Sequence, residues 1–277
     1  MKAKNFKKDN NNFVYRNFKS GIKYILDSRS YILFSTCLFL LIIILGFAFP
    51  VFFTEEIFNY IQQLVRETEN LGGFQMIAFI INNNVWSSFF GLFLGFFLGI
   101  IPLGLIVING YVVGFVANKV VSVDGIISLW RLLPHGIFEI PAIMISTGLG
   151  LKLGMFFFYG KDKKKGVLAF FAFFFCWILS LMFLSFVISL FAGTNEPTAL
   201  QNFYETIMKD SSVVFLIFLM MIIFIFLSLF VSLKVFSRKD KDFIKNNFKS
   251  NTIDSVRVFI FVIIPLLVVA GIIEGVL

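Results

Sequence analysis

The stretch Arg131–Gly154, RLLPHGIFEIPAIMISTGLGLKLG, determines how the rest of this chain is interpreted. Its apolar length is sufficient for a transmembrane helix. It nevertheless contains His135, the only histidine of the protein, and Glu139 four residues later, so that both lie on one face of a helix. Because ionisable groups are costly at membrane depth, such a pair indicates a functional or structural requirement.

Small residues continue the same helical face toward its C-terminal end. They are Ala142, Ser146, Gly150 and Gly154. Small residues at this spacing let a second helix approach closely, so the polar pair should face protein rather than lipid. Pro134 suits the first turn of a helix, whereas Pro141 lies inside it and leaves the carbonyl of Ile137 without its usual donor.

The composition of the chain is that of a polytopic membrane protein. Of its 277 residues, 58% are hydrophobic and only 14% are charged. In soluble domains about a quarter of all residues are charged. The net charge of +8 does not indicate a nucleic-acid partner, because the basic residues gather in short segments between apolar runs. We therefore expect an all-α transmembrane bundle of about six to seven spans in the cell membrane, without a soluble domain.

The distribution of charge predicts the orientation of these spans. Residues 1–30 form a basic arm that should be cytoplasmic, followed by a transmembrane domain over residues 31–277. The Lys-rich segments 161–165 and 238–241 should also be cytoplasmic, which places the C-terminus outside. Residues 54–73 carry apolar side chains at helical spacing and predict an interfacial helix. The expected spans are residues 31–53, 134–158, 166–192, 211–236 and 255–277, with one or two more within 85–123.

Residues 85–123 must return to the side where they begin if both Lys-rich segments are cytoplasmic. Two short helices or a re-entrant hairpin would achieve this, whereas a single long crossing would leave segment 161–165 outside. The residues available to break the helix are Pro102, Gly104, Asn109 and Gly110. A groove for a neighbouring helix is predicted where small residues recur every four positions, at Gly91, Gly95 and Gly99.

A polar cluster near the outer face is the sharpest inference from these positions. Glu139 lies near the outer start of its span and Glu274 near the outer end of the last one. The polar residues expected at the same depth are Asn82, Asn83 and Asn84. The cluster fits a hydrogen-bonded network that stabilises packing, or a proton relay or solute site that uses His135. Catalytic zinc usually takes three protein ligands, and this chain has one histidine and no H-E-x-x-H motif, so we predict no metal site. We also predict no cofactor and no catalytic residue.

Several motifs resemble the stage II sporulation protein M family of integral membrane proteins. They are NNNV at 82–85, the Gly-spaced helix at 91–99, NGYVVG at 109–114, PHGIFEIPA at 134–142 with Gly136 in it, GLGLKLG at 148–154 and AGIIEG at 270–275. In endospore formers the resemblance implies a membrane anchor that assembles with sporulation proteins D and P, which hold the peptidoglycan-cutting activity. Family members also occur in bacteria and archaea that make no spores.

Together these observations favour a non-enzymatic multi-pass membrane protein that scaffolds a cell-envelope or membrane-remodelling complex. Its expected partners are the lipid bilayer and other membrane or envelope proteins, while the sequence leaves the oligomeric state open. The alternative is a transporter or channel that uses His135, Glu139 and Glu274.

Overall fold

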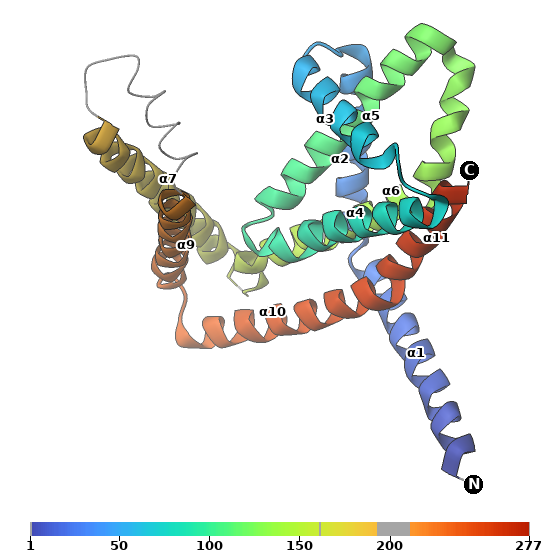
Figure 1. Ribbon diagram of the computed structural model, residues 1–277. Helices are drawn as coiled ribbons and strands as arrows, with labels where there is room; N and C mark the ends of the chain where they lie inside the picture. The colour runs from blue at the N-terminus through green and yellow to red at the C-terminus, as the bar shows by residue number, and fades with distance from the viewer. Residues whose placement is uncertain (1, 161, 193–210, 277) are drawn as a thin grey trace. The chain divides into compact units, whose positions relative to one another are not determined.

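The computed structural model describes residues 2–160, 162–192 and 211–276 (Figure 1). These residues form helices joined by short turns, which confirms the predicted all-α class. The chain divides into two compact units. Unit 1 comprises Met1–Phe156 and Phe248–Leu277, and unit 2 comprises Phe157–Asn247.

Unit 1 contains the helices whose motifs dominate the sequence. Its first helices are α1 (Lys2–Asp27), α2 (Arg29–Ala48), α3 (Thr54–Thr68), α4 (Gly73–Phe93), α5 (Ile100–Asp124) and α6 (Leu133–Gly154). Two short 3₁₀ turns, η1 (Leu94–Phe96) and η2 (Ile126–Leu132), connect α4 to α5 and α5 to α6. The C-terminal part of unit 1 comes from the end of α10 (Arg238–Val258), a π-turn (Phe259–Ile263) and α11 (Ile264–Val276).

The predicted number of membrane spans agrees with the structure. Within the described residues, six helices are long and apolar enough to cross a bilayer, since a span needs about 20 residues. They are Arg29–Ala48, Gly73–Phe96, Ile100–Asp124, Gly136–Gly154, Lys163–Phe183 and the apolar part of Arg238–Gly275. A shorter apolar stretch, Ile223–Leu233, belongs to α9 (Ser211–Leu233). The protein is therefore a multi-pass membrane protein.

The break predicted within residues 85–123 lies between α4 and α5. Leu98 and Gly99 have positive φ angles of 55° and 71°, a conformation that glycine adopts without steric cost. Gly99 is the N-cap of α5 and turns the chain back. The residues expected to break the helix instead all lie within α5, namely Pro102, Gly104, Asn109 and Gly110. Pro102 is tolerated because N–H groups of the first turn have no intrahelical partner.

Contacts between residues define the relative directions of the helices in unit 1. The contacts between α2 and α5 include Gly110 with Ile42 and Asn118 with Phe47. Those between α2 and α6 include Gly148 with Ile32 and Met144 with Ser35. The first pair of contacts shows that α5 runs parallel to α2. The second shows that α6 runs in the opposite direction.

Helices α4 and α11 follow the same alternation. Ser88 of α4 contacts Ser146 of α6. About two turns further along both segments, Gly95 of η1 contacts Gly154 of α6, so α4 runs parallel to α6 (Figure 1). The contacts between α11 and α4 are Gly271 with Ile81 and Gly275 with Ile77, which makes α11 antiparallel to α4. Segment 85–123 therefore belongs to two helices of opposite direction, and not to one long crossing.

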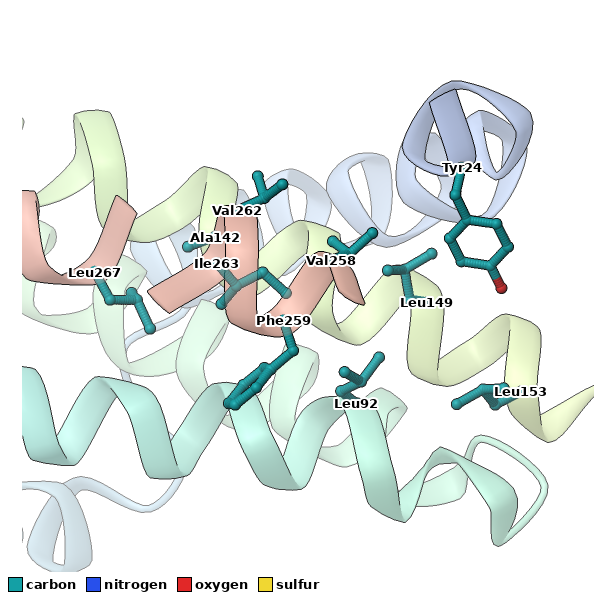
Figure 2. Packing of buried hydrophobic residues seen from close by; sticks show 10 residues of the cluster. All are labelled: Tyr24, Leu92, Ala142, Leu149, Leu153, Val258, Phe259, Val262, Ile263 and Leu267. Atoms are coloured by element: carbon teal, nitrogen blue, oxygen red, sulfur yellow. The ribbon is translucent and has the colours of Figure 1, made fainter. Parts of the chain in front are cut away.

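The main hydrophobic core lies between α4, α6 and the helix that contains the π-turn (Figure 2). Its buried residues are Tyr24, Leu92, Ala142, Leu149, Leu153, Val258, Phe259, Val262, Ile263 and Leu267. Figure 2 shows Phe259 pointing toward α4. Its ring forms edge contacts with Phe89 and Phe93 at centroid distances of 6.0 and 5.7 Å. Aromatic pairs of this geometry add to the packing energy of a core.

A π-turn joins the polar helix α10 to the apolar helix α11. Pro265 cannot donate a backbone hydrogen bond, and its ring would clash with the carbonyl of Phe261 in a regular α-helix. The wider turn accommodates the proline because the N–H of Ile264 donates to the carbonyl of Phe259, five residues earlier. Residues 238–254, which lie between the last two expected spans, are therefore helical as well.

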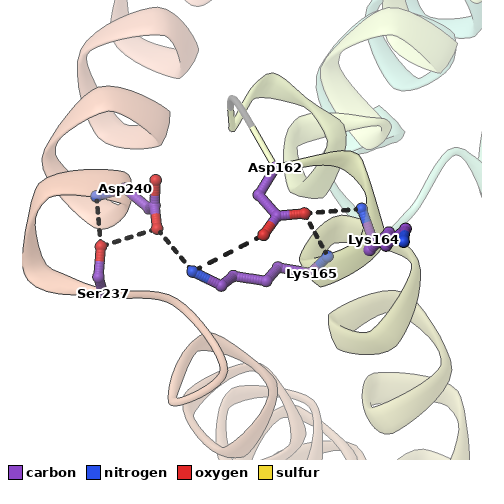
Figure 3. A network of polar contacts seen from close by, with 5 residues as sticks. All are labelled: Asp162, Lys164, Lys165, Ser237 and Asp240. Carbon is purple, nitrogen blue, oxygen red and sulfur yellow. Dashed lines mark hydrogen bonds and ion pairs between the residues drawn. The ribbon is translucent and has the colours of Figure 1, made fainter.

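Unit 2 is built from α7 (Lys163–Ala192), α9 and the start of α10. The rings of Phe183 of α7 and Phe224 of α9 meet edge to face, with their centroids 6.2 Å apart. At its N-terminal end, α7 pairs Lys165 with Asp240 at 3.5 Å (Figure 3). Asp162 accepts the N–H of Lys164 at 3.0 Å, which stabilises the first turn of α7. Residues 193–210, between the expected spans 166–192 and 211–236, lie outside the described residues.

Candidate functional site

The backbone of α4 and of the turn η1 that continues it touches the backbone of α6 where both segments carry glycine. A Cβ atom added to Gly95 would overlap the carbonyl group of Gly150, and one added to Gly150 would overlap the carbonyl oxygen of Gly91. The same holds for Gly154, whose Cβ would overlap the backbone of Gly95 and Gly99. Because main-chain atoms cannot move aside independently, this crossing requires glycine on both helices.

Hydroxyl groups tie α2, α4 and α6 together beside the glycine crossing. Ser146 donates a hydrogen bond to the carbonyl oxygen of Ser88. The Oγ atoms of Ser35 and Thr147 lie 2.7 Å apart, and Thr147 also donates to the carbonyl oxygen of Ile143 at 2.8 Å. A polar group without a partner is costly in an apolar interior, so these bonds favour this arrangement of the helices.

Ser35 and Ser88 were not singled out in the sequence. The signal that could have found them is a pair of adjacent hydroxyl residues inside an otherwise apolar span, Ser35 with Thr36 and Ser87 with Ser88. Both Ser35 and Ser88 are fully buried. A hydroxyl residue can also bond to its own helix, so this signal does not reveal the partner.

The two carboxylates of the predicted polar cluster lie at the same end of unit 1. In the register set by Ser88 and Ser146, Glu139 lies level with Ile81 of α4. Gly271 of α11 packs against Ile81, and Glu274 follows less than one turn later. Both glutamates are partly buried, and Oε2 of Glu274 is buried from solvent. Direct contact between the two carboxylates stays a prediction.

The three asparagines of the predicted cluster face different directions. Helix α4 begins at Gly73, so they lie inside the helix rather than at its outer start. Asn84 is only 6% exposed and lies on the face that carries Ser88 and Gly91. Asn82 and Asn83 are exposed. Of the three, Asn84 is therefore the one directed into the protein.

His135 belongs to α6 through its backbone, and its side chain lies outside the described residues. Pro134 is the second residue of α6, and Pro141 lies inside the same helix, as the sequence places them. Asn109 donates to the carbonyl oxygen of Leu105 in its own helix at 2.8 Å, so this amide group has a local role.

A second polar group lies at the opposite end of α6 and was not predicted. Lys152 donates to Oγ of Ser28 at 2.9 Å, and its Nζ atom lies 4.1 Å from the ring centroid of Tyr24. The Tyr24 hydroxyl donates to Oδ1 of Asn251 at 3.0 Å. Burial raises the pKa of the Tyr24 phenol to about 12, so it is neutral at physiological pH. This group connects α1, α6 and α10.

Comparison with known proteins now identifies the family. A sequence model described as stage II sporulation protein M matches residues 35–196, which is more than half of the chain. The chain belongs to this family. The matched region of the chain begins within α2, includes all of α7 and ends at residue 196. It includes the glycine crossing and the serine and threonine contacts beside it.

An uncharacterised protein of Methanocaldococcus jannaschii is similar to this family member. The two sequences are 28% identical over 196 residues, which cover 65% of this chain and 86% of the other protein. No solved structure matches the chain.

Proposed function

We propose that this protein is a non-enzymatic membrane scaffold that holds partner proteins of a cell-envelope or membrane-remodelling complex. The observation that carries the proposal is that glycines of the family's motifs lie where two helices are in backbone contact. Gly91 of α4 and Gly95 of the adjoining turn η1 are in backbone contact with Gly150 and Gly154 of α6. Close backbone packing at these glycines favours a rigid anchor over a solute pathway, because a solute pathway must open and close.

The helices also expose surfaces that partners can contact. One is an apolar stripe on α7 at helical spacing, formed by Leu168, Phe171, Phe175, Ile178 and Met182. Another is the polar side of α3, where Asn59, Gln62, Gln63 and Arg66 line a shallow groove. The two surfaces suit different partners, one within the membrane and one at its surface.

The scaffold is expected to insert with its N-terminus in the cytoplasm and its C-terminus outside, because the basic segments should remain inside. A cysteine at Asp162, in a variant without the free cysteines Cys37 and Cys176, should resist an impermeant maleimide added to intact cells. It should react after permeabilisation. A cysteine at the exposed Gln62 of α3 should be labelled from outside and serves as the control. Labelling at Asp162 in intact cells would reverse the assignment.

The scaffold role is tested by photo-crosslinking in the native host. Full-length tagged protein carries a photoreactive phenylalanine at Phe171 or Phe175, which are exposed, or at Phe173, which is 3% exposed on the same helix. We expect discrete protein adducts from the two exposed positions, absent at Phe173, and the same partner in mild-detergent purification. The adduct should be identified as an envelope protein whose localisation depends on this chain.

Two outcomes would count against the scaffold. One is recovery of a lone monomer without adducts under several mild conditions. The other is a proton or solute flux in proteoliposomes of the purified protein that the Glu139→Gln variant abolishes, which would instead assign the protein to transport.

A further inference from the structure

We propose that α1 lies in the membrane interface and that its basic flank binds the headgroups of anionic lipids. This inference concerns a ligand of unit 1 and does not depend on the scaffold role. It rests on the division of the α1 surface into three flanks, one packed on protein, one apolar and one basic.

The first flank of α1 packs against the helix that contains the π-turn. Asn17 accepts a hydrogen bond from Nε of Arg257 at 3.0 Å, and the ring of Phe13 lies 6.0 Å from that of Phe261. Gly21 is buried against Val258. These contacts hold α1 in one rotational setting, which determines where its other side chains point.

The second flank is apolar, and the described residues of the protein leave it uncovered. Val14 is 54% exposed, Phe18 is 44% exposed and Leu26 is 63% exposed. These positions follow one another around one side of the helix, next to the packed flank. A contiguous apolar surface on a helix that is otherwise charged is typical of helices that lie with one face in the acyl chains.

The third flank is basic. Arg16, Lys19 and Lys23 are exposed and lie at helical spacing of three and four residues, between the apolar and packed flanks on the other side. Residues 13–26 contain no acidic residue, and Asp27 follows one turn after Lys23. Clusters of lysine and arginine beside a membrane span attract anionic lipid headgroups.

The position of α1 in the chain explains why lipid is the ligand. Only Ser28 separates α1 from α2, whose apolar span begins at Arg29. Helix α1 therefore ends where a membrane span begins, and the lipid headgroups lie at that level. A helix at that depth meets hydrocarbon on its apolar flank and phosphate groups on its basic flank, so charge and polarity are both matched.

The test uses the full-length protein in nanodiscs that contain both phosphatidylglycerol and phosphatidylcholine. An environment-sensitive fluorophore is attached to a cysteine at Phe18, in the variant without Cys37 and Cys176. Either lipid is then replaced, in separate samples, by its brominated form at equal mole fraction. We expect quenching by both lipids, with brominated phosphatidylglycerol stronger by about twofold or more.

Two charge variants separate specific binding from general electrostatics. The triple variant Arg16→Gln, Lys19→Gln, Lys23→Gln should keep lipid quenching but lose the preference for phosphatidylglycerol. The matched control neutralises three exposed lysines of α10, Lys239, Lys241 and Lys245, and should keep the preference.

Equal quenching by the two brominated lipids in the unmodified charge background would overturn the anionic-lipid site. A fluorophore at Phe18 that is quenched by aqueous iodide but not by lipid would overturn the interfacial placement. A second probe position at Val14, on the same flank, should reproduce the result and covers the case in which the Phe18 variant does not fold.

Discussion

Replacement of Gly150 by alanine is expected to destabilise the protein by about 3 kcal/mol, at the upper end of the usual cost of overpacking. The added methyl group overlaps the carbonyl oxygen of Gly91 and lies 3.0 Å from Cγ of Pro102. Because the obstacle is main chain, α4 and α6 must separate, and the bond from Ser146 to Ser88 is then stretched as well. Thermal unfolding in mild detergent, followed by size-exclusion chromatography, measures the loss.

The matched control is Gly104→Ala in α5. No atom lies within 4 Å of the position that its methyl group would occupy. Alanine favours a helix over glycine by about 0.5–1 kcal/mol, so this variant should be neutral or slightly more stable. If the Gly150→Ala variant unfolded at the same temperature as the unmodified protein, the result would contradict the backbone contact between α4 and α6.

The Phe259→Ala variant is expected to lose about 2–3 kcal/mol of stability. Phe259 is 8% exposed and packs on Phe89 and Phe93. In soluble cores such a change costs about 3–5 kcal/mol, part of which is the transfer of the side chain from water. That part is small here because lipid is as apolar as the core, whereas the lost packing contacts remain.

Ile260→Ala is the control for the neighbouring position. Its side chain is 48% exposed and lies on the other side of the π-turn from the core, so truncation should change stability by less than about 0.5 kcal/mol. Similar losses for both variants would mean that Phe259 does not pack against α4. A double-mutant cycle with Phe89→Ala should show coupling between the two rings, as expected for side chains in contact.

The sequence predicted the spans well because their signal is local. A run of about 20 predominantly apolar residues suffices to recognise α2. Glycine at four-residue spacing, in the pairs Gly91 with Gly95 and Gly150 with Gly154, indicated helices that approach closely. The break before α5 was located less well. Its position depends on the backbone conformation at Leu98 and Gly99, whereas Pro102 lies in the first turn of a helix and does not interrupt it.

The polar residues show the limit of reasoning from spacing. The pair Glu139 and Glu274 could be placed at one end because each lies near a predicted span boundary. The partners of Lys152 could not be predicted, since Ser28 and Tyr24 lie more than a hundred residues away along the chain. Such contacts depend on how separate helices rotate against each other.

By itself, the sequence determined that this protein is a helical multi-pass membrane protein with close helix packing in its motif regions. These properties follow from hydropathy, charge and residue size, which act within one helix or at its ends. Only the tertiary structure decided that Gly150 meets Gly91, that Asn84 turns inward while Asn82 does not, and that α1 exposes separate apolar and basic flanks. Each of these depends on the register and rotation of two helices, and packing between distant segments sets both.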